Sequence, residues 1–117
     1  MTVMPIQSPS KRASLAPSFG KASYFAFVYG AGEEVTIVSN RDGSGMAMVE
    51  MIRAKGADTV VIKGIEREPL EALFDMGVRV YYAGSARITI EGAAARMVNQ
   101  SLEQVTPERA RALFPKR

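Results

Sequence analysis

Residues 58–84 constrain what this chain can fold into more than any other stretch. Residues 59–62 (TVVI) form a short run rich in Val and Ile, which is typical of a strand covered on both faces. Pro69 suits the first turn of a helix whose apolar stripe is formed by residues 70, 73 and 74. Gly77 can end that helix in a left-handed conformation, and residues 78–83 return as a second strand. Strand, helix and strand make a right-handed βαβ unit, which predicts an α/β protein.

The sequence before this unit predicts three strands and one helix. Residues 2–7 form a short strand interrupted by Pro5, a residue usually restricted to edges, strand ends or bulges. Either this strand is marginal, or Pro5 lies where the ladder breaks. Residues 23–29 and 33–39 form an antiparallel hairpin around the turn at residues 30–32. Residues 45–55 then show the apolar spacing of a helix, which Gly56 ends.

After the central unit, Thr89 is a candidate N-cap for a third helix, with an apolar stripe through Ala94, Met97 and Val98 to residues 101–102. Residues 106–108 (TPE) start a short terminal helix. We therefore expect a five-stranded mixed sheet with three main helices, some on each face, and a short C-terminal helix. Residues 1–105 form the α/β domain, and residues 106–117 form the short helix and a basic tail.

The composition excludes several classes of function. The chain has no Cys and no His, so disulfides, thiolate chemistry, zinc fingers and histidine acid–base catalysis are absent. Most of the net charge of +3 lies in the terminal tail, which is weak support for a nucleic-acid partner. No apolar run is long enough to span a membrane and no signal peptide is evident, so we expect a cytoplasmic protein. The predicted strands carry no carboxylate cluster of the kind a nuclease needs.

Aromatic and thioether side chains have structural explanations. Residues 24–29 (YFAFVY) place large groups on both faces of their strand, which favours a core between helices over a base-stacking surface. Met46, Met48 and Met51 are the only cluster of soft ligands. Their helical spacing favours gap-filling Met in the core over a metal site.

Three loops are expected to meet at the C-terminal ends of the strands, where open α/β sheets bind ligands. These are residues 8–18, 40–45 and 64–68, and cations flank them. A rim of cations near a helix N-terminus suits an anion, although such charges are more often simply solvated. Glu66 and Glu68 at the same helix start would repel an anion. Residues 18–21 (SFGK) can form an anion-binding turn, in which Gly20 permits close backbone approach.

Several motifs resemble one known family. Residues 17–25 (PSFGKASYF) resemble the SxHFGxAxYF segment of the dinitrogenase iron–molybdenum cofactor biosynthesis family. Residues 60–65 (VVIKGI), 72–73 and 76–81 are similar to its second signature, and residues 4–6 (MPI) to its first strand. The resemblance covers roughly residues 2–102. It implies a three-layer α/β/α ribonuclease H-like fold. It also implies non-enzymatic binding or carriage of an iron–molybdenum or other metal–sulfur cluster, with that cofactor or a cofactor-assembly protein as partner.

The chain departs from the family pattern at three places. Ser18 replaces the usual His, residues 42–45 (DGSG) replace a His-rich or Gly-His-Gly loop, and Glu66 replaces a common Gly. The chain therefore lacks direct His or Cys ligands, and we expect an anionic cluster to be held without them, or cluster binding to be altered or lost. The candidate site residues are Lys11, Arg12, Ser18, Gly20, Lys21, Arg41, Ser44, Lys63, Gly64 and Arg67. The alternative is a structural or protein-interaction module on the same fold, and neither function excludes a homo-oligomer.

Overall fold

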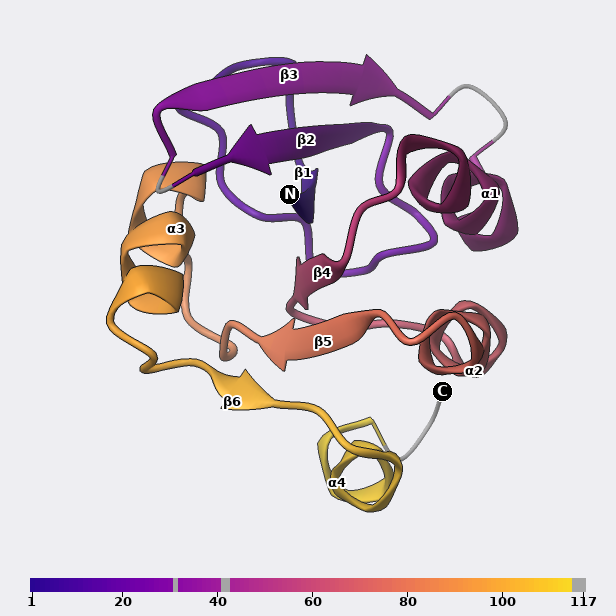
Figure 1. Ribbon diagram of the computed structural model, residues 1–117. Coiled ribbons are helices and arrows are strands. Elements are labelled where there is room, and N and C mark those ends of the chain that lie inside the picture. Colours follow the sequence, from indigo (N-terminus) through magenta and orange to yellow (C-terminus); the bar gives the residue numbers. More distant parts are fainter. Residues whose placement is uncertain (31, 41–42, 115–117) are drawn as a thin grey trace.

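A computed structural model describes residues 1–30, 32–40 and 43–114 (Figure 1). Along these residues the elements are β1 (Thr2–Ile6), β2 (Tyr24–Tyr29), β3 (Glu34–Ser39), α1 (Gly45–Lys55), β4 (Thr59–Ile62), α2 (Arg67–Asp75), β5 (Arg79–Tyr82), α3 (Ile90–Val98), β6 (Glu103–Gln104) and α4 (Pro107–Leu113). The expected α/β class and the order of its first eight elements are confirmed. The predicted basic tail at Lys116 and Arg117 lies outside the described residues.

The strands form one mixed sheet in the order β3-β2-β1-β4-β5-β6. The hairpin pairs β2 with β1 and β3 antiparallel, whereas β4 is parallel to both β1 and β5. The predicted count of five strands is wrong by one, because Glu103 and Gln104 form a sixth strand opposite Tyr82 and Tyr81. A two-residue strand leaves no periodicity in the sequence, and tertiary pairing with β5 forms it.

Pro5 lies in the central strand at a place where it needs no donor toward β4. The parallel pairing of β1 with β4 covers only Thr2 and Val3, opposite Thr59 and Val60. Beyond this point the Pro5 carbonyl accepts a hydrogen bond from the Ala16 N–H (2.8 Å). The sequence left two explanations open, and the structure supports the second, a proline where the ladder ends.

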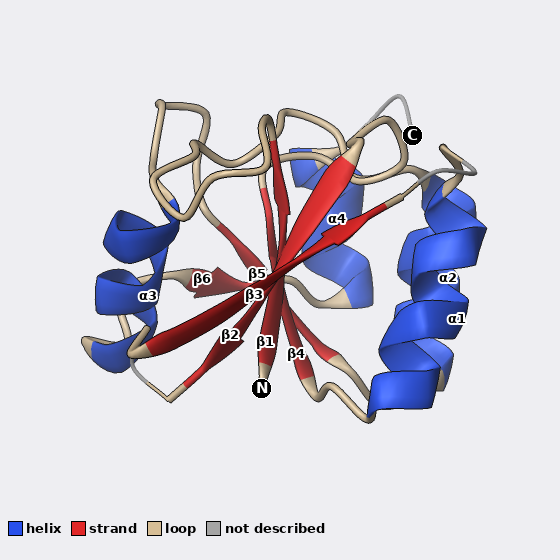
Figure 2. Cartoon of the chain, turned by 90° about the horizontal axis from the view of Figure 1, so that it is seen from above, coloured by secondary structure: helices blue, strands red, loops and turns tan. Residues whose placement is uncertain are grey.

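Helices cover both faces of the sheet, with α1, α2 and α4 on one side and α3 on the other (Figure 2). The aromatic strand β2 illustrates the arrangement. Phe25 and Phe27 pack in the layer between the sheet and α1, α2 and α4, which we call the first layer, and Ala26 and Val28 pack in the second layer, between the sheet and α3. All four side chains are buried, which confirms a core strand in place of a base-stacking surface. Met48 is likewise fully buried in the first layer, as the core explanation of the methionines predicts.

Helices begin or end at the capping residues predicted at Thr89, Thr106, Gly56 and Gly77, and α1 begins at a cap that was not predicted, Ser44. The side chains of Ser44, Thr89 and Thr106 each accept a hydrogen bond from an N–H three residues ahead, at 3.1, 3.1 and 3.2 Å. Gly56 and Gly77 follow α1 and α2 with φ of 70° and 76°.

The third helix is shorter than its apolar stripe predicted. It ends at Val98, whose side chain is 60% exposed, and Gln100 adopts a positive φ of 58°. The predicted continuation through residues 101–102 is therefore wrong. The turn after Val98 is needed to bring β6 back to β5. Beyond β6, Arg109 of α4 pairs with Glu103, and the Phe114 ring packs edge-on against Tyr82 with centroids 5.9 Å apart.

The long loop after β1 is partly buried. Leu15 bridges back to Ile6, and Ser14 bridges to Thr89 at the start of α3. The Arg87 side chain also donates to the Ser14 hydroxyl (2.9 Å). This segment therefore ties β1 to the layer that contains α3. Among the described residues, no helix is long and apolar enough to cross a membrane.

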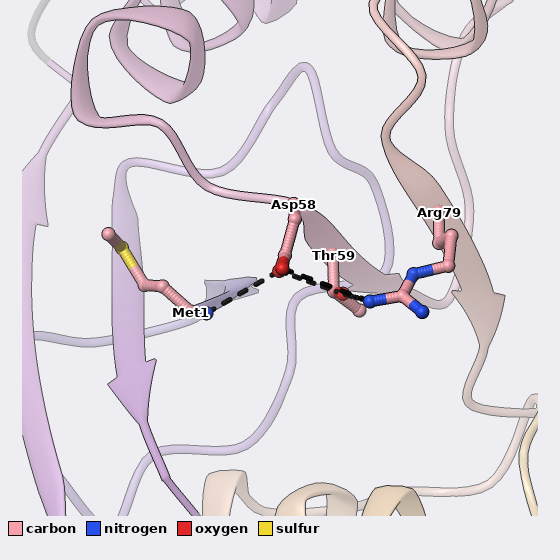
Figure 3. A network of polar contacts seen from close by, with 4 residues as sticks. All are labelled: Met1, Asp58, Thr59 and Arg79. Atoms are coloured by element: carbon pink, nitrogen blue, oxygen red, sulfur yellow. Dashed lines mark hydrogen bonds and ion pairs between the residues drawn. The ribbon is translucent and has the colours of Figure 1, made fainter.

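A polar network joins three neighbouring strands at the sheet end where β1, β4 and β5 begin (Figure 3). The Asp58 carboxylate lies 3.4 Å from the Met1 amino group and 3.8 Å from the Arg79 guanidinium, and it accepts from the Thr59 hydroxyl at 3.1 Å. Burial works to raise the pKa of Asp58, but these three groups together lower it below its usual value. The network fastens the end of the sheet remote from the candidate site.

Candidate functional site

The candidate site lies at the opposite end of the sheet, where β1, β4 and β5 finish. The chain leaves β1 toward β2 on one side, whereas β4 pairs on the other side of β1, so the strand order switches between β1 and β4. Ligands bind preferentially at such a switch in open α/β sheets. Two segments lie together there, residues 17–20 before β2 and residues 64–66 before α2.

A set of three hydrogen bonds fastens these two segments. The Phe19 N–H donates to the Gly64 carbonyl (2.9 Å). The Glu66 carboxylate accepts from the Gly20 N–H (2.9 Å) and from the Ser18 hydroxyl. We call these contacts of Ser18, Phe19, Gly20, Gly64 and Glu66 the loop clamp. It fixes Gly20 and Glu66, two residues that line a cavity at this end of the sheet.

Close packing explains both glycines of the loop clamp. A Cβ added at Gly64 would lie 2.6 Å from the Pro17 carbonyl oxygen, a contact that backbone atoms cannot relieve without moving. A Cβ added at Gly20 would lie 2.5 Å from a Glu66 carboxylate oxygen. Glycine at both positions therefore allows the two segments to approach each other closely. The sequence had suggested a different reason for Gly20, the close approach of an anion to the backbone.

The start of α1 completes the site. The Asn40 side chain is buried and its amide donates to the carbonyls of Ala22 (3.3 Å) and Ser44 (3.2 Å), which anchors the N-cap beside the loop clamp. The first turn of α1 contains no acidic residue. The N–H groups of Gly45 and Met46, the first two residues of the helix, have no partner within it and carry the positive end of its dipole.

A cavity of 330 Å³ lies between the loop clamp and the first turns of α1 and α2. It is lined by Gly20, Lys21, Gly43, Ser44, Gly45, Met46, Glu66, Glu68 and Pro69. Three candidate residues from the sequence thus come together here, namely Gly20, Lys21 and Ser44. Lys21 is exposed and supplies a positive charge, while Glu66 and Glu68 supply negative charges on the side of α2.

The other candidate residues lie in different places. Ser18 and Gly64 belong to the loop clamp and do not line the cavity. Lys63 is half-buried just after β4, and Arg67 is the exposed first residue of α2; neither lines the cavity.

Lys11 and Arg12 are not brought together with Lys21. Together with Glu91, they line a separate hollow at the start of α3, the helix on the other face of the sheet. The loop that carries them folds over that helix, where the Ile90 N–H donates to the Ala13 carbonyl (3.2 Å). The predicted rim of cations is therefore divided between the two faces of the sheet, with Lys21 on one and Lys11 and Arg12 on the other. Arg41 lies outside the described residues.

Sequence reasoning missed the part that Glu66 plays. Its carboxylate was expected to repel an anion, and the structure shows that it also holds Ser18 and Gly20 in place. Ser18 and Glu66 were noted separately as departures from the family pattern, and the structure shows that they contact each other. The fact that both positions depart from the family pattern was the sequence signal from which their contact could have been inferred. Asn40 was missed as well, since no local pattern distinguishes it from other loop residues.

The residues at the site do not fit a directly ligated metal. The chain contains no Cys or His, and within the described ranges no three Asp or Glu side chains are grouped to hold a metal ion. The cavity is instead lined by Lys21 and by the first residues of α1, and a cation beside a helix N-terminus suits an anion held by charge and hydrogen bonds.

Comparison with known proteins identifies the family. Residues 1–100 match the family model described as dinitrogenase iron-molybdenum cofactor. The chain belongs to this family. No curated protein sequence matches the chain.

Solved structures share the fold of this family member. The apo form of the orange protein from Desulfovibrio gigas superposes with a TM-score of 0.81 at 19% identity, covering 90% of this chain and 92% of that one. A candidate NifB protein from Thermotoga gives a TM-score of 0.75 at 23% identity, covering 92% and 97%. A candidate dinitrogenase from Methanocaldococcus jannaschii gives 0.69 at 14% identity, covering 90% and 93%. At these identities the likeness shows the fold alone.

Proposed function

We propose that this protein is a non-enzymatic binding or carrier protein for an anionic metal–sulfur cluster of the iron–molybdenum type. The observation that carries the proposal is the cavity where Lys21 meets the acid-free first turn of α1, at the strand switch of a cofactor-family domain. The cluster is cargo in this proposal and is exchanged with cofactor-assembly proteins.

Binding in this cavity rests on charge and on backbone donors, because the chain has no His or Cys to ligate iron or molybdenum. Lys21 neutralises part of the negative charge, and the N–H groups of Gly45 and Met46 point from the helix start toward the cargo. The loop clamp holds Gly20 against the cavity wall. Glu66 and Glu68 oppose an anion on the α2 side, so the cargo lies closer to α1.

Titration with tetrathiomolybdate, an anionic molybdenum–sulfur compound, tests the proposal. The protein should retain stoichiometric molybdenum after desalting and gain visible absorbance. Lys21→Ala should weaken binding about five- to tenfold, which corresponds to roughly 1 kcal/mol of charge pairing. Lys11→Ala is the matched control, since it removes the same charge from the other face. No retained molybdenum, or equal weakening by both variants, refutes this site.

A second candidate function, a protein-interaction module without a small-molecule site, is favoured by one observation. The Glu66 carboxylate already accepts hydrogen bonds from the Ser18 hydroxyl and the Gly20 N–H, so these two donors at the strand switch are occupied within the protein. Glu68→Gln distinguishes the two functions, because Glu68 lines the cavity but takes no part in the loop clamp. Under the first, it removes a negative charge from the cavity and raises tetrathiomolybdate uptake. Absence of uptake by both wild type and Glu68→Gln supports the module.

A further inference from the structure

The strand β3 forms an open edge of the sheet, opposite the edge formed by β6 (Figure 1). Natural sheets protect their edges with very short strands, Lys, Pro or bulges. The edge at β6 follows this rule, because β6 has only two residues. In contrast, β3 pairs with β2 one-to-one over six residues without a bulge, and its sequence EVTIVS contains no Lys or Pro. Within the described residues, nothing pairs with its outer side.

The backbone groups that point outward from β3 can be assigned from one hydrogen bond. The Asn40 N–H donates to the Ser23 carbonyl at 2.8 Å, so this opposed pair is hydrogen-bonded. Bonded and non-bonded pairs alternate along an antiparallel ladder. Val38, Thr36 and Glu34 therefore direct their N–H and C=O groups toward β2. The intervening residues Val35, Ile37 and Ser39 direct theirs outward.

This pattern makes the edge complementary to itself. Antiparallel pairing opposes residues of the same bonding class, so a second copy of β3 fits with a two-fold axis at Ile37. Val35 then lies opposite Ser39 of the second copy, and Thr36 lies opposite Val38. No like charges oppose each other, since Glu34 at the strand end is the one charged residue of β3.

The side chains along this edge suit such a contact. Val35 and Ile37 are half-buried and pack against the α3 layer, and Val38 is half-buried on the other face. In the two-fold arrangement, residues that face one another lie on the same side of the sheet, so each half-exposed apolar group meets an apolar or neutral partner. The remaining apolar exposure at β3 is thereby covered.

We propose that β3 is an interface through which two copies of this chain join, antiparallel, into one continuous sheet. The proposal does not depend on the ligand proposed above. One strand from each copy gives an interface at the small end of the range, where complexes are transient. The dimer therefore forms in a concentration-dependent way.

Sedimentation of the full chain over about 1 µM to 1 mM tests the interface, a range that spans weak affinities. The wild type should shift from monomer to dimer mass. Ile37→Lys places two ammonium groups opposite each other at the axis and should raise the dimer Kd more than about tenfold. Gln104→Lys makes the same charge change on β6 and should leave the Kd unchanged. Ser39→Pro, which removes an outward donor and leaves the ladder to β2 intact, serves as a second variant if Ile37→Lys fails to fold.

Cysteine cross-linking tests the register, because the chain has no Cys of its own. Opposed Cα atoms in a hydrogen-bonded pair lie about 5.5 Å apart, within the disulfide range. Ile37→Cys should therefore give a covalent dimer on mild oxidation, and Thr36→Cys, which does not oppose itself, should give little. A monomer throughout the concentration range overturns the proposal. Equal cross-linking at both positions overturns the register, and with it the assignment of this interface.

Discussion

The loop clamp should contribute measurably to stability, and Glu66→Ala tests this most directly. The substitution removes an acceptor that serves both the Ser18 hydroxyl and the Gly20 N–H. Hydrogen bonds to charged groups contribute about 1.5–3 kcal/mol each, and the lower end applies where water can reach the freed donors. Ser18, Gly20 and Glu66 are all half-buried, so water can replace part of the loss. We expect a total loss of about 1.5–3 kcal/mol.

Urea unfolding followed by circular dichroism measures this loss, and the midpoint should fall without a change in slope. For a domain of this size the melting temperature should drop by roughly 5–12 °C. Glu71→Ala is the matched control, because it removes an exposed carboxylate from the middle of α2, the helix that Glu66 precedes. It should cost less than about 0.5 kcal/mol.

A double-mutant cycle with Ser18→Ala isolates the side-chain pair. If Ser18 and Glu66 interact as described, the two losses should fall short of additivity by about 0.5–1.5 kcal/mol. Additive losses, or an unfolding midpoint of Glu66→Ala equal to that of the wild type, would refute the claim that this carboxylate fastens the two segments.

Three further substitutions probe other parts of the fold. Gly64→Ala brings a Cβ to 2.6 Å from the Pro17 carbonyl oxygen and should destabilise the protein by about 2–3 kcal/mol in urea unfolding. Asp58→Asn should cost about 0.5–1 kcal/mol at neutral pH, since this carboxylate is mostly exposed. Because the folded pKa of Asp58 is lowered, its stabilisation is present above the unfolded value of about 3.9 and lost as pH falls through the folded one, so the difference from wild type should shrink in acid. Phe114→Ala removes a buried ring from Tyr82 and should cost about 3 kcal/mol, measured by thermal unfolding.

The sequence predicts those parts of the fold that depend on local patterns. The run at β4, the cap at Thr89 and the glycine after α1 each follow from a few neighbouring residues, and all are confirmed. β6 is different. Glu103 and Gln104 have no strand preference of their own and become a strand only because they return beside β5.

The candidate site shows the same difference between features that follow from local patterns and features that depend on tertiary contacts. The loop clamp joins Ser18 to Glu66 across 48 positions, and no spacing rule connects residues so far apart. The separation of Lys11 from Lys21 was equally hidden, because the face on which a loop folds depends on tertiary contacts such as that between Ala13 and Ile90. Sequence reasoning placed these charges at one end of the sheet and could not sort them by face.

The central position of β1 has a consequence for how the chain folds during synthesis. β1, β2 and β3 can pair as soon as residue 39 has emerged, but the other side of β1 must wait for residues 59–62. Until then, β1 is an open edge of the nascent three-stranded sheet, opposite the open edge at β3. The interval ends when β4 pairs with Thr2 and Val3, a contact between distant positions that forms slowly. The strand made first therefore stays an open edge until residues 59–62 pair with it, and during this stage of synthesis the chain is exposed to aggregation.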